Sequence, residues 1–237
     1  YVGTDADNFG LTVVATTTSG NVTFDSLSTG TLTLTSVNTA ANPLSVTADG
    51  NVIATDVDTT TGTLTLATSS GTMVLNDIDS TEGAMNIDAT SAITVTAVNS
   101  TTGEINIETS GASDIAIAAA AIGSTSGNVI VTANNAAGTI TLADGTDKIT
   151  VAGADADVTL SAGATIAVTG GADNDVDIDA GGTISLTADT ITAVDVEALD
   201  TLVIGDTGAG AITVDELTGS TIAATTITVG NDGFGTI

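Results

Sequence analysis

The sequence contains no cysteine and no histidine, and Lys148 is its only basic residue. Without cysteine, neither a disulfide framework nor a thiolate metal site can form. Covalent catalysis by Ser–His or Cys–His pairs is excluded as well, because each pair needs a side chain that the chain lacks. Nucleic acid is excluded as a partner, since binding to a phosphate backbone requires several lysines or arginines to displace its counterions.

Aromatic residues make up only 2% of the chain, a single proline is present, and no apolar run approaches the ~18 residues of a membrane span. With so few rings, Val, Ile, Leu and Ala must fill the core, and the many β-branched residues favour strands over helices. We therefore predict an all-β protein that does not insert into a membrane.

Acidic residues, by contrast, are abundant: 29 Asp and Glu give a formal net charge of −28. Such a surface keeps the protein soluble but repels itself, so we expect screening salt or divalent cations to stabilise the fold. Lys148 directly follows Asp147, and we expect these two side chains to form a simple ion pair at the surface.

Similar segments repeat through the first half of the chain, at 31–38, 51–58, 72–79 and 92–99. Apolar residues alternate in them with Thr, Asn or Asp, the period-2 pattern of a strand with one buried face. The aligned segments form three apolar columns: Leu32/Val52/Met73/Ile93, Leu34/Ala54/Leu75/Val95 and Val37/Val57/Ile78/Val98. A second class of strands between them forms two more columns: Val22/Leu44/Leu64/Met85/Ile105 and Phe24/Val46/Leu66/Ile87/Ile107.

Two strands in roughly every 20 to 21 residues describe one coil of a β-solenoid. From position 139 onward the pattern recurs after about 18 residues, as from Ile140 to Val158 and from Ile166 to Ile184, which predicts a narrower coil. Residues 114–122, with their small side chains, are predicted as a transition rung and not as a helix. We therefore predict one continuous parallel β-solenoid over residues 1–237, with roughly 18 to 21 residues per coil. Its predicted parts are wider coils (about 10–112), a transition (113–127) and narrower coils (about 128–237).

The two ends of the chain share a short motif. Phe9-Gly10 lies near the start and Phe234-Gly235 near the end, and the closing residues have the pattern of a new strand. The terminal coils of a solenoid expose unpaired strand edges that another coil can cover. We expect this unit to be one link of a longer rod, either continued in a longer repetitive chain or assembled head to tail.

Three stretches carry a family resemblance: residues 138–145 (GTITLADG), 157–163 (DVTLSAG) and 175–182 (DVDIDAGG). They resemble the degenerate repeats of filamentous-haemagglutinin-like exoproteins and related autotransporter passengers, and the resemblance covers most of the chain. It implies a right-handed parallel β-helix that a Gram-negative bacterium secretes. It also implies an extracellular location at the cell surface and a role in adhesion or surface structure.

The repeat register predicts that carboxylates of two coils meet. Asp56 and Asp58 would face Asp77 and Asp79 about one strand spacing away, where two unit charges repel by roughly 1 kcal/mol in water. A bound cation would remove this repulsion, and Ca²⁺ is the candidate because it prefers oxygen ligands. The alternative is a solvated acidic turn with a ladder of Asx hydrogen bonds, which is favoured because Asp is common in turns. No other cofactor is indicated.

The favoured function is an extracellular structural or adhesive segment of a surface filament, fibre or layer, with copies of the same unit or cell-surface glycans as partners. The first alternative is a module that binds ice or glycans on a flat Thr-rich face, as at Thr63/Thr65 and Thr139/Thr141. Asn86 and other residues interrupt this threonine ladder, so β-propensity explains the threonines more simply.

The second alternative is a glycosidase that uses two carboxylates, such as Asp175 and Asp177. Outward residues on a flat sheet provide no cleft, and the aromatic residues that stack on sugars are nearly absent. We therefore predict that the protein is not an enzyme.

Overall fold

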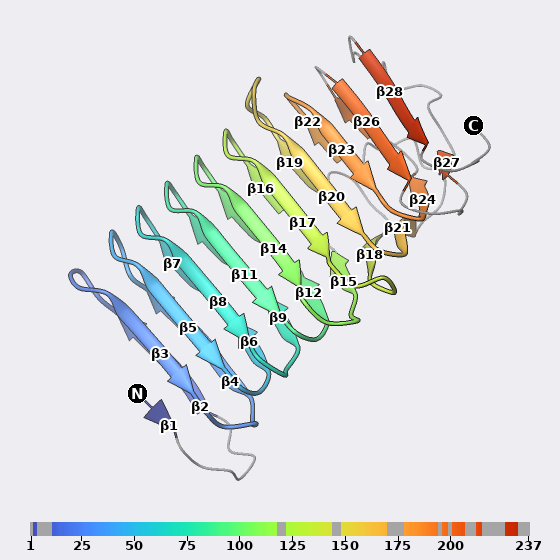
Figure 1. Ribbon diagram of the computed structural model, residues 1–237. Helices are drawn as coiled ribbons and strands as arrows, with labels where there is room; N and C mark the ends of the chain where they lie inside the picture. Colours follow the sequence, from blue (N-terminus) through green and yellow to red (C-terminus); the bar gives the residue numbers. More distant parts are fainter. Residues whose placement is uncertain are drawn as a thin grey trace.

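Parallel β-strands form all the regular structure in the part of the chain that the computed structural model describes (Figure 1). This part comprises residues 2–3, 11–117, 122–143, 148–169, 178–193, 196–198, 201–206, 212–214 and 226–231. Across these ranges no helix is long and apolar enough to cross a membrane. The predicted all-β fold, a parallel β-solenoid, is confirmed.

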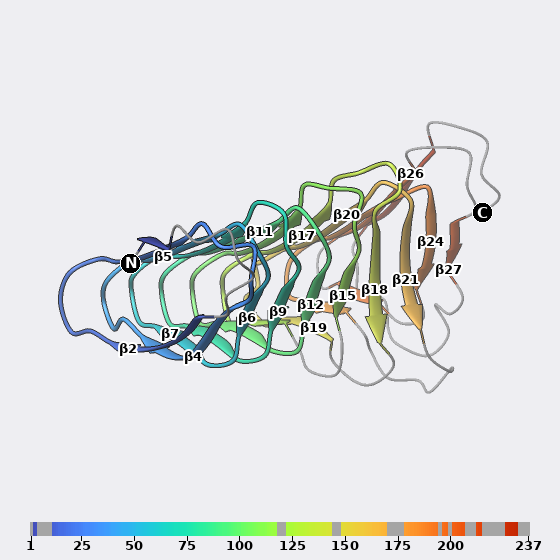
Figure 2. The same cartoon turned by 90° about the horizontal axis from the view of Figure 1, so that it is seen from below.

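The strands lie in three stacks, and Figure 2 shows the coils following one another along one axis. The first stack contains β1 (Val2–Gly3), β3 (Val22–Ser26), β5 (Leu44–Ala48), β8 (Leu64–Thr68), β11 (Met85–Ala89), β14 (Ile105–Thr109), β17 (Val129–Ala133), β20 (Val158–Ala162), β23 (Ile184–Thr187), β26 (Thr201–Asp206) and β28 (Thr226–Asn231). The second contains β2 (Leu11–Thr16), β4 (Leu32–Asn38), β6 (Val52–Ala54), β9 (Met73–Leu75), β12 (Ile93–Val95), β15 (Ile115–Ile117), β18 (Thr139–Ala143), β21 (Thr165–Thr169), β24 (Thr190–Ala193) and β27 (Ile212–Val214). The third contains β7 (Val57–Thr59), β10 (Ile78–Ser80), β13 (Val98–Ser100), β16 (Ile122–Ser124), β19 (Ile149–Val151), β22 (Ile178–Ala180) and β25 (Val196–Ala198).

The core follows from the alternation of side chains along each strand. In β11, for example, Met85, Ile87 and Ala89 are buried, whereas Asn86 and Asp88 are exposed. Since the strands pair in parallel register from one coil to the next, buried residues stack on buried residues along the axis.

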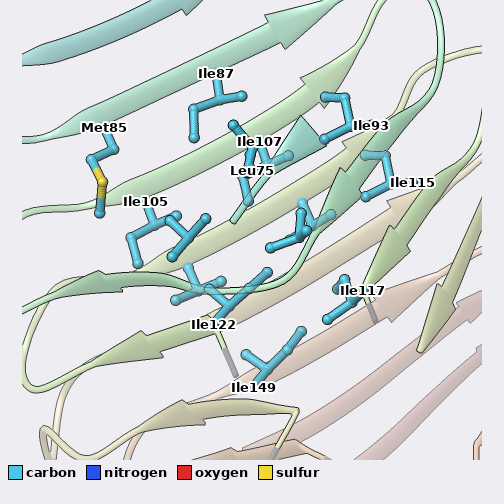
Figure 3. Close-up of a cluster of buried hydrophobic side chains, with 14 of the residues drawn as sticks. Leu75, Met85, Ile87, Ile93, Ile105, Ile107, Ile115, Ile117, Ile122 and Ile149 are labelled. Carbon is cyan, nitrogen blue, oxygen red and sulfur yellow. The ribbon is translucent and has the colours of Figure 1, made fainter. Parts of the chain in front are cut away.

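All five predicted apolar columns are confirmed by this register. Their members are buried, except that Val22 and Phe24 pack against the core while partly exposed. The apolar core runs from Val13 to Leu202 as one cluster. Figure 3 shows its centre, where side chains of all three stacks meet, with Ile105, Ile93 and Ile122 as examples.

The coils from β5 to β25 each contain three strands, whereas the repeats predict two. In the first repeated segment, residues 31–38, the two strands are joined into the single strand β4. Its first part, Leu32–Leu34, pairs with β6, and its last part, Val37 and Asn38, pairs with β7. In the following coils, the residue pairs 55–56, 76–77 and 96–97 separate a strand of the second stack from one of the third. Two consecutive outward residues stand at this point, and the break in the alternation is where the chain turns a corner.

The predicted narrowing of the coils in the second half is wrong at Ile140, Val158 and Ile166, and it holds only later, as at the step from Ile184 to Leu202. Ile140 pairs with Ile166 and not with Val158, which belongs to the first stack and pairs there with Ile184. The number of residues from Ile140 to Ile166, and from Val158 to Ile184, is larger than the number between paired residues of the first coils. Along the first stack the steps are uneven: the longest joins Val129 to Val158, and the shortest joins Ile184 to Leu202. The error arose because strands of different stacks share one alternating pattern, so the period alone does not tell which strands pair.

The predicted transition at 113–127 is instead an ordinary part of the solenoid in its described residues. Ile115 and Ile117 of β15 are buried and pair with β12 and β18, and Ile122 of β16 pairs with β13 and β19. Residues 118–121 lie outside the described part. The expectation of strands in place of a helix is confirmed at both ends of this segment.

A four-residue motif, a hydroxyl residue followed three positions later by glycine, closes the corner between the third and first stacks. It occurs at residues 59–62 (TTTG), 80–83 (STEG), 100–103 (STTG) and 124–127 (STSG). The Ser80 hydroxyl donates to the carbonyl oxygen of Gly83 (2.7 Å), whereas the backbone N–H of Gly127 donates to Ser124 Oγ (2.8 Å). In these two turns the hydroxyl thereby satisfies a backbone group, whereas the hydroxyls of Thr59 and Ser100 have no partner among the described residues.

The glycine of this motif permits close stacking of the coils. A Cβ on Gly83 would overlap the carbonyl oxygen of Gly62, and a Cβ on Gly103 would overlap that of Gly83. The same holds for Gly127 above Gly103. Because the obstacle is backbone, any side chain at these positions forces neighbouring coils apart.

We predict that Gly83→Ala destabilises the protein by about 1–3 kcal/mol, the usual range for an overpacked site. Urea unfolding followed by circular dichroism measures this effect. The matched control is Thr81→Ala, which removes an exposed side chain from the same turn. Equal stabilities of the two variants would contradict close coil stacking at this corner.

Candidate functional site

The predicted acidic residues lie on the outward face of the third stack. In the strand register, Asp58 lies between Asn38 and Asp79, and Asp79 lies between Asp58 and Asn99. We call these four residues the Asx column. Asn38 and Asp58 are half-buried, and Asp79 and Asn99 are exposed. The register thus brings two carboxylates from successive coils side by side, as the sequence predicts.

Each carboxylate of the Asx column accepts a hydrogen bond from an asparagine. The amide of Asn38 donates from Nδ2 to Asp58 Oδ2 (3.3 Å), and the amide of Asn99 donates from Nδ2 to Asp79 Oδ1 (3.1 Å). Asp58 and Asp79 therefore each have an amide on one side and a like charge on the other.

Partial burial raises the pKa of Asp58 above its ordinary value of 3.8, and the negative charges of Asp56, Asp79 and Asp77 raise it further. The hydrogen bond from Asn38 opposes this rise because it favours the ionised carboxylate. The charged form of Asp58 is therefore disfavoured in the folded protein.

The four predicted calcium ligands thus share one surface: Asp58 and Asp79 are neighbours in the register, and Asp56 and Asp77 precede β7 and β10 at the corner. Within the described ranges, no group of three or more His, Cys, Asp or Glu side chains is arranged to hold a metal ion. The two asparagine hydrogen bonds are those of an Asx ladder, the alternative interpretation. Calcium binding at these residues stays a prediction.

A groove of about 570 Å³ adjoins the Asx column on the same face. It crosses four coils along the solenoid axis. Its first wall consists of outward residues of β10, β13, β16 and β19: Asp79, Asn99, Gly123 and Thr150. Its second wall consists of exposed residues just beyond these strands: Thr81, Thr101, Thr125 and Ala152. Between the walls lie buried serines: Ser80, Ser100 and Ser124.

Gly123 interrupts the first wall, because it brings no side chain into the register between Asn99 and Thr150. A Cβ at this position would lie 2.8 Å from Asn99 Oδ1, so the asparagine side chain leans over the glycine. Seven hydroxyl residues, one amide and one carboxylate are among the eleven residues of the lining, although apolar atoms make up slightly more than half of its exposed surface.

Two hydroxyl groups of the groove have no hydrogen-bond partner among the described residues. Ser100 is only 6% exposed, and its Oγ is buried without a partner there, unlike the hydroxyl oxygens of Ser80 and Ser124 in the same stack. Thr150 Oγ1 is buried in the same way. An unsatisfied buried hydroxyl destabilises a fold, and Thr59 of β7, outside the groove, carries a third one, so this feature belongs to the third stack and not to the groove alone.

Lys148 does not lie at the surface as the sequence analysis expects. It is only 2% exposed and directly precedes β19, as Asp56 precedes β7 and Asp77 precedes β10. Asp147, its expected ion-pair partner, lies outside the described residues. The expected surface position of Lys148 is therefore wrong, although Asp56 and Asp77 at the equivalent positions are not buried, and its ion pair with Asp147 stays a prediction.

The threonines of the alternative binding face form only a short ladder. Thr139 stacks on Thr165, which stacks on Thr190. By contrast, Thr65 pairs with Ser45 and Asn86, and Thr141 pairs with Ala116 and Ala167. The carboxylates of the alternative glycosidase, Asp175 and Asp177, lie outside the described residues.

The groove was missed by the sequence analysis, although the sequence holds a signal for it. The Asx column ends at Asn99, and the residue that pairs with Asn99 in the next coil is Gly123. The number of residues between these two is larger than between earlier members of the column. An alignment of the STTG motif at 100–103 with the STSG motif at 124–127 would have shown this longer spacing. It would also have placed Gly123 beside Asn99 in the first wall of the groove.

No family model, no curated protein and no solved structure matches this chain. Its function is therefore inferred from its own residues.

We predict that Asp58→Asn stabilises the protein at pH 7 by about 0.2–1 kcal/mol, the range of exposed charge pairs. Because the pKa of Asp58 is raised on folding, its charge weakens the fold above the folded pKa. This penalty shrinks as the pH falls and is absent below 3.8, the unfolded value. The advantage of the variant should vanish over the same range.

Urea unfolding at a series of pH values provides the measurement. The matched control is Asp25→Asn, whose register neighbours, Val2 and Thr47, carry no charge. It should stabilise the protein less than Asp58→Asn at pH 7. An advantage of Asp58→Asn that persists unchanged below pH 3.8 would contradict the prediction.

Proposed function

We propose that this chain is a segment of an extracellular rod with a structural or adhesive role at a cell surface. The observation that carries the proposal is the continuous parallel register of the first stack, together with one apolar core that extends along it. In such a solenoid each coil contacts chiefly its neighbours, so length is gained by adding coils without changing the existing contacts. This architecture suits a spacer or fibre.

The surface charge supports the same role. With 29 acidic residues and one basic residue, two rods side by side repel each other unless cations lie between them. Association along the axis is the remaining route, because main-chain hydrogen bonds across a joint do not depend on side-chain charge. Copies of the same unit, joined covalently or head to tail, are therefore the proposed partners.

Cations are the second proposed partner. Besides Asp58 and Asp79, the register places Asp88 of β11 beside Glu108 of β14, so like charges adjoin on two faces of the rod. Cations gathered by these carboxylates reduce the repulsion, and a divalent ion does so at lower concentration than a monovalent one. Calcium at Asp56, Asp58, Asp77 and Asp79 is the specific form of this proposal.

For the rod, we predict an elongated scattering profile and end-to-end association that grows with protein concentration. Small-angle scattering and sedimentation measure these properties, and electron microscopy distinguishes filaments from isolated rods. High salt should preserve the axial joints while allowing rods to approach sideways. A compact profile, or a monomer that stays unassociated at all concentrations, would refute the filament.

For calcium, we predict a melting temperature several degrees higher in millimolar Ca²⁺ than in chelator, because bound ions stabilise the folded state by mass action. The Asp58→Asn/Asp79→Asn double variant should lose most of this shift. The control Asp25→Asn should keep it. If sodium chloride at equal ionic strength raises the melting temperature as much, specific calcium binding is wrong and only screening acts.

A further inference from the structure

We infer that two copies of this chain pair sideways, in salt that screens their charge, through the outward face of the second stack. The inference goes beyond the proposed axial association and does not depend on it, because the contact lies along the rod and not at its ends. It follows from the way in which charge is distributed over the three stacks.

Among the described residues, the outward positions of the second-stack strands carry no charge. In the strand register they form one column from β2 to β21, and Figure 2 shows these strands one after another along the rod. All its members are Thr, Ile, Val or Ala: Thr12, Thr33, Ile53, Val74, Thr94, Ala116, Thr141 and Ala167. By contrast, Asp88 and Glu108 stand at outward positions of the first stack, and Asp58 and Asp79 stand at those of the third.

The outward positions beside this column are almost uncharged as well. In the coils from β4 to β12 they are residues 31, 51, 72 and 92 before it and residues 35, 55, 76 and 96 after it, all Thr, Asn or Ala. Asp114, just before β15, is charged, and its Oδ1 accepts from the backbone N–H of Thr139 (3.1 Å). Asp56 and Asp77 lie one position further, at the corner with the third stack. We call the column and the positions beside it the second-stack face.

Apolar side chains are concentrated at this face. Ile53 and Val74 pair in the register, and both are half-buried at outward positions of the column. Val14 is 70% exposed and Leu27 is 44% exposed, and these are the exposed large apolar residues of the described part. Leu27 precedes β4 at the corner with the first stack, and Val14 lies in β2 beside Ser36, so both border the face. Exposed apolar surface rimmed by polar residues is typical of protein–protein contacts.

Charge and shape select a second copy of the chain as the partner. A basic partner is attracted more strongly to the acidic first and third stacks, and an acidic partner is repelled by the net charge of −28. Two second-stack faces, by contrast, meet without bringing carboxylates together at their centre. Flat sheets of β-branched side chains pack face to face about 10 Å apart. Because the same face is used on both copies, the contact has two-fold symmetry.

The size of the face fits a weak dimer. A strip of eight strands, about 4.8 Å apart and about 14 Å wide, covers about 500 Å² on each chain. The total of about 1,000 Å² is close to the lower limit of specific protein interfaces. Carboxylates elsewhere on the two rods still repel, and salt screens them. We therefore expect a Kd of about 10–100 µM in about 0.5 M NaCl, and at least roughly tenfold weaker pairing in about 0.05 M NaCl.

Sedimentation equilibrium over this range of salt measures the pairing, and paired variants locate it. Thr94→Asp adds a carboxylate to the middle of the face and should weaken the dimer at least roughly tenfold, because the two-fold contact brings two such charges together. Thr65→Asp adds the same charge to the first stack, between Ser45 and Asn86, and should change the Kd by less than about twofold. A monomer at every salt concentration, or equal weakening by both variants, would overturn the inference.

A second pair of variants should act in the opposite direction. Asp114→Asn removes a charge from the face while keeping an oxygen acceptor for the backbone N–H of Thr139, so the dimer should tighten about two- to fivefold. Asp88→Asn makes the same charge change on the first stack and should tighten it by less than about twofold. Circular dichroism checks that all variants fold alike. Equal tightening by the two variants would show a general effect of charge and contradict this face.

Spin labels distinguish the sideways contact from an axial joint. Since the chain has no cysteine, Thr94→Cys provides a single labelling site in the middle of the face. In the sideways pair the two labels should lie within roughly 35 Å of each other, whereas an axial joint separates them by one rod length, about 50 Å for the eleven strands of the first stack. Labels at Asn106→Cys, on the first stack, should be farther apart than those at Thr94→Cys. Pulsed electron paramagnetic resonance measures both distances, and the reverse order, or an axial distance at Thr94, would refute the pairing.

Discussion

Backbone hydrogen bonds between successive coils are the interaction on which the rest of this structure depends. They join strands that are distant in the chain, and their parallel register decides which side chains become neighbours. These hydrogen bonds require the backbones of neighbouring coils to lie close together. Glycines permit this at the corner, where Gly62, Gly83 and Gly103 lie against one another. Core, charged columns and groove all follow from this register, because each is a column of equivalent positions.

Stacking of equivalent positions stabilises the fold where the side chains are apolar or amides, but it destabilises the fold where they are carboxylates. A column of Ile or Leu builds a core, and an Asn beside an Asp adds a hydrogen bond, whereas Asp58 beside Asp79 places like charges together. The order Asn38, Asp58, Asp79, Asn99 limits the column to one such contact and gives each carboxylate an amide on its other side. The raised pKa of Asp58 reflects a repulsion that the asparagines reduce without removing.

The columns from Leu32 and Val22 onward could be predicted because the alternation and the spacing of the repeats are regular there. The number of strands per coil could not be predicted from the alternation of buried and outward residues alone. At the corner formed by residues 55–56, this alternation is interrupted by only one extra outward residue. The coil length in the second half was misjudged because Ile140 and Val158 share a pattern but belong to different stacks. Likewise, the adjacency of Asp58 and Asp79 followed from the sequence, whereas the groove depended on a change of step beside Gly123.

The three-strand coil also has a mechanical consequence. A pull along the axis loads the hydrogen bonds between coils in line with the force, so a coil peels away strand by strand while the coils below it keep their contacts. Each coil that detaches releases its whole contour, roughly 60–100 Å of extended chain. Under load such a rod lengthens in steps set by its own repeat, and it dissipates work at every step before any neighbouring molecule has to let go.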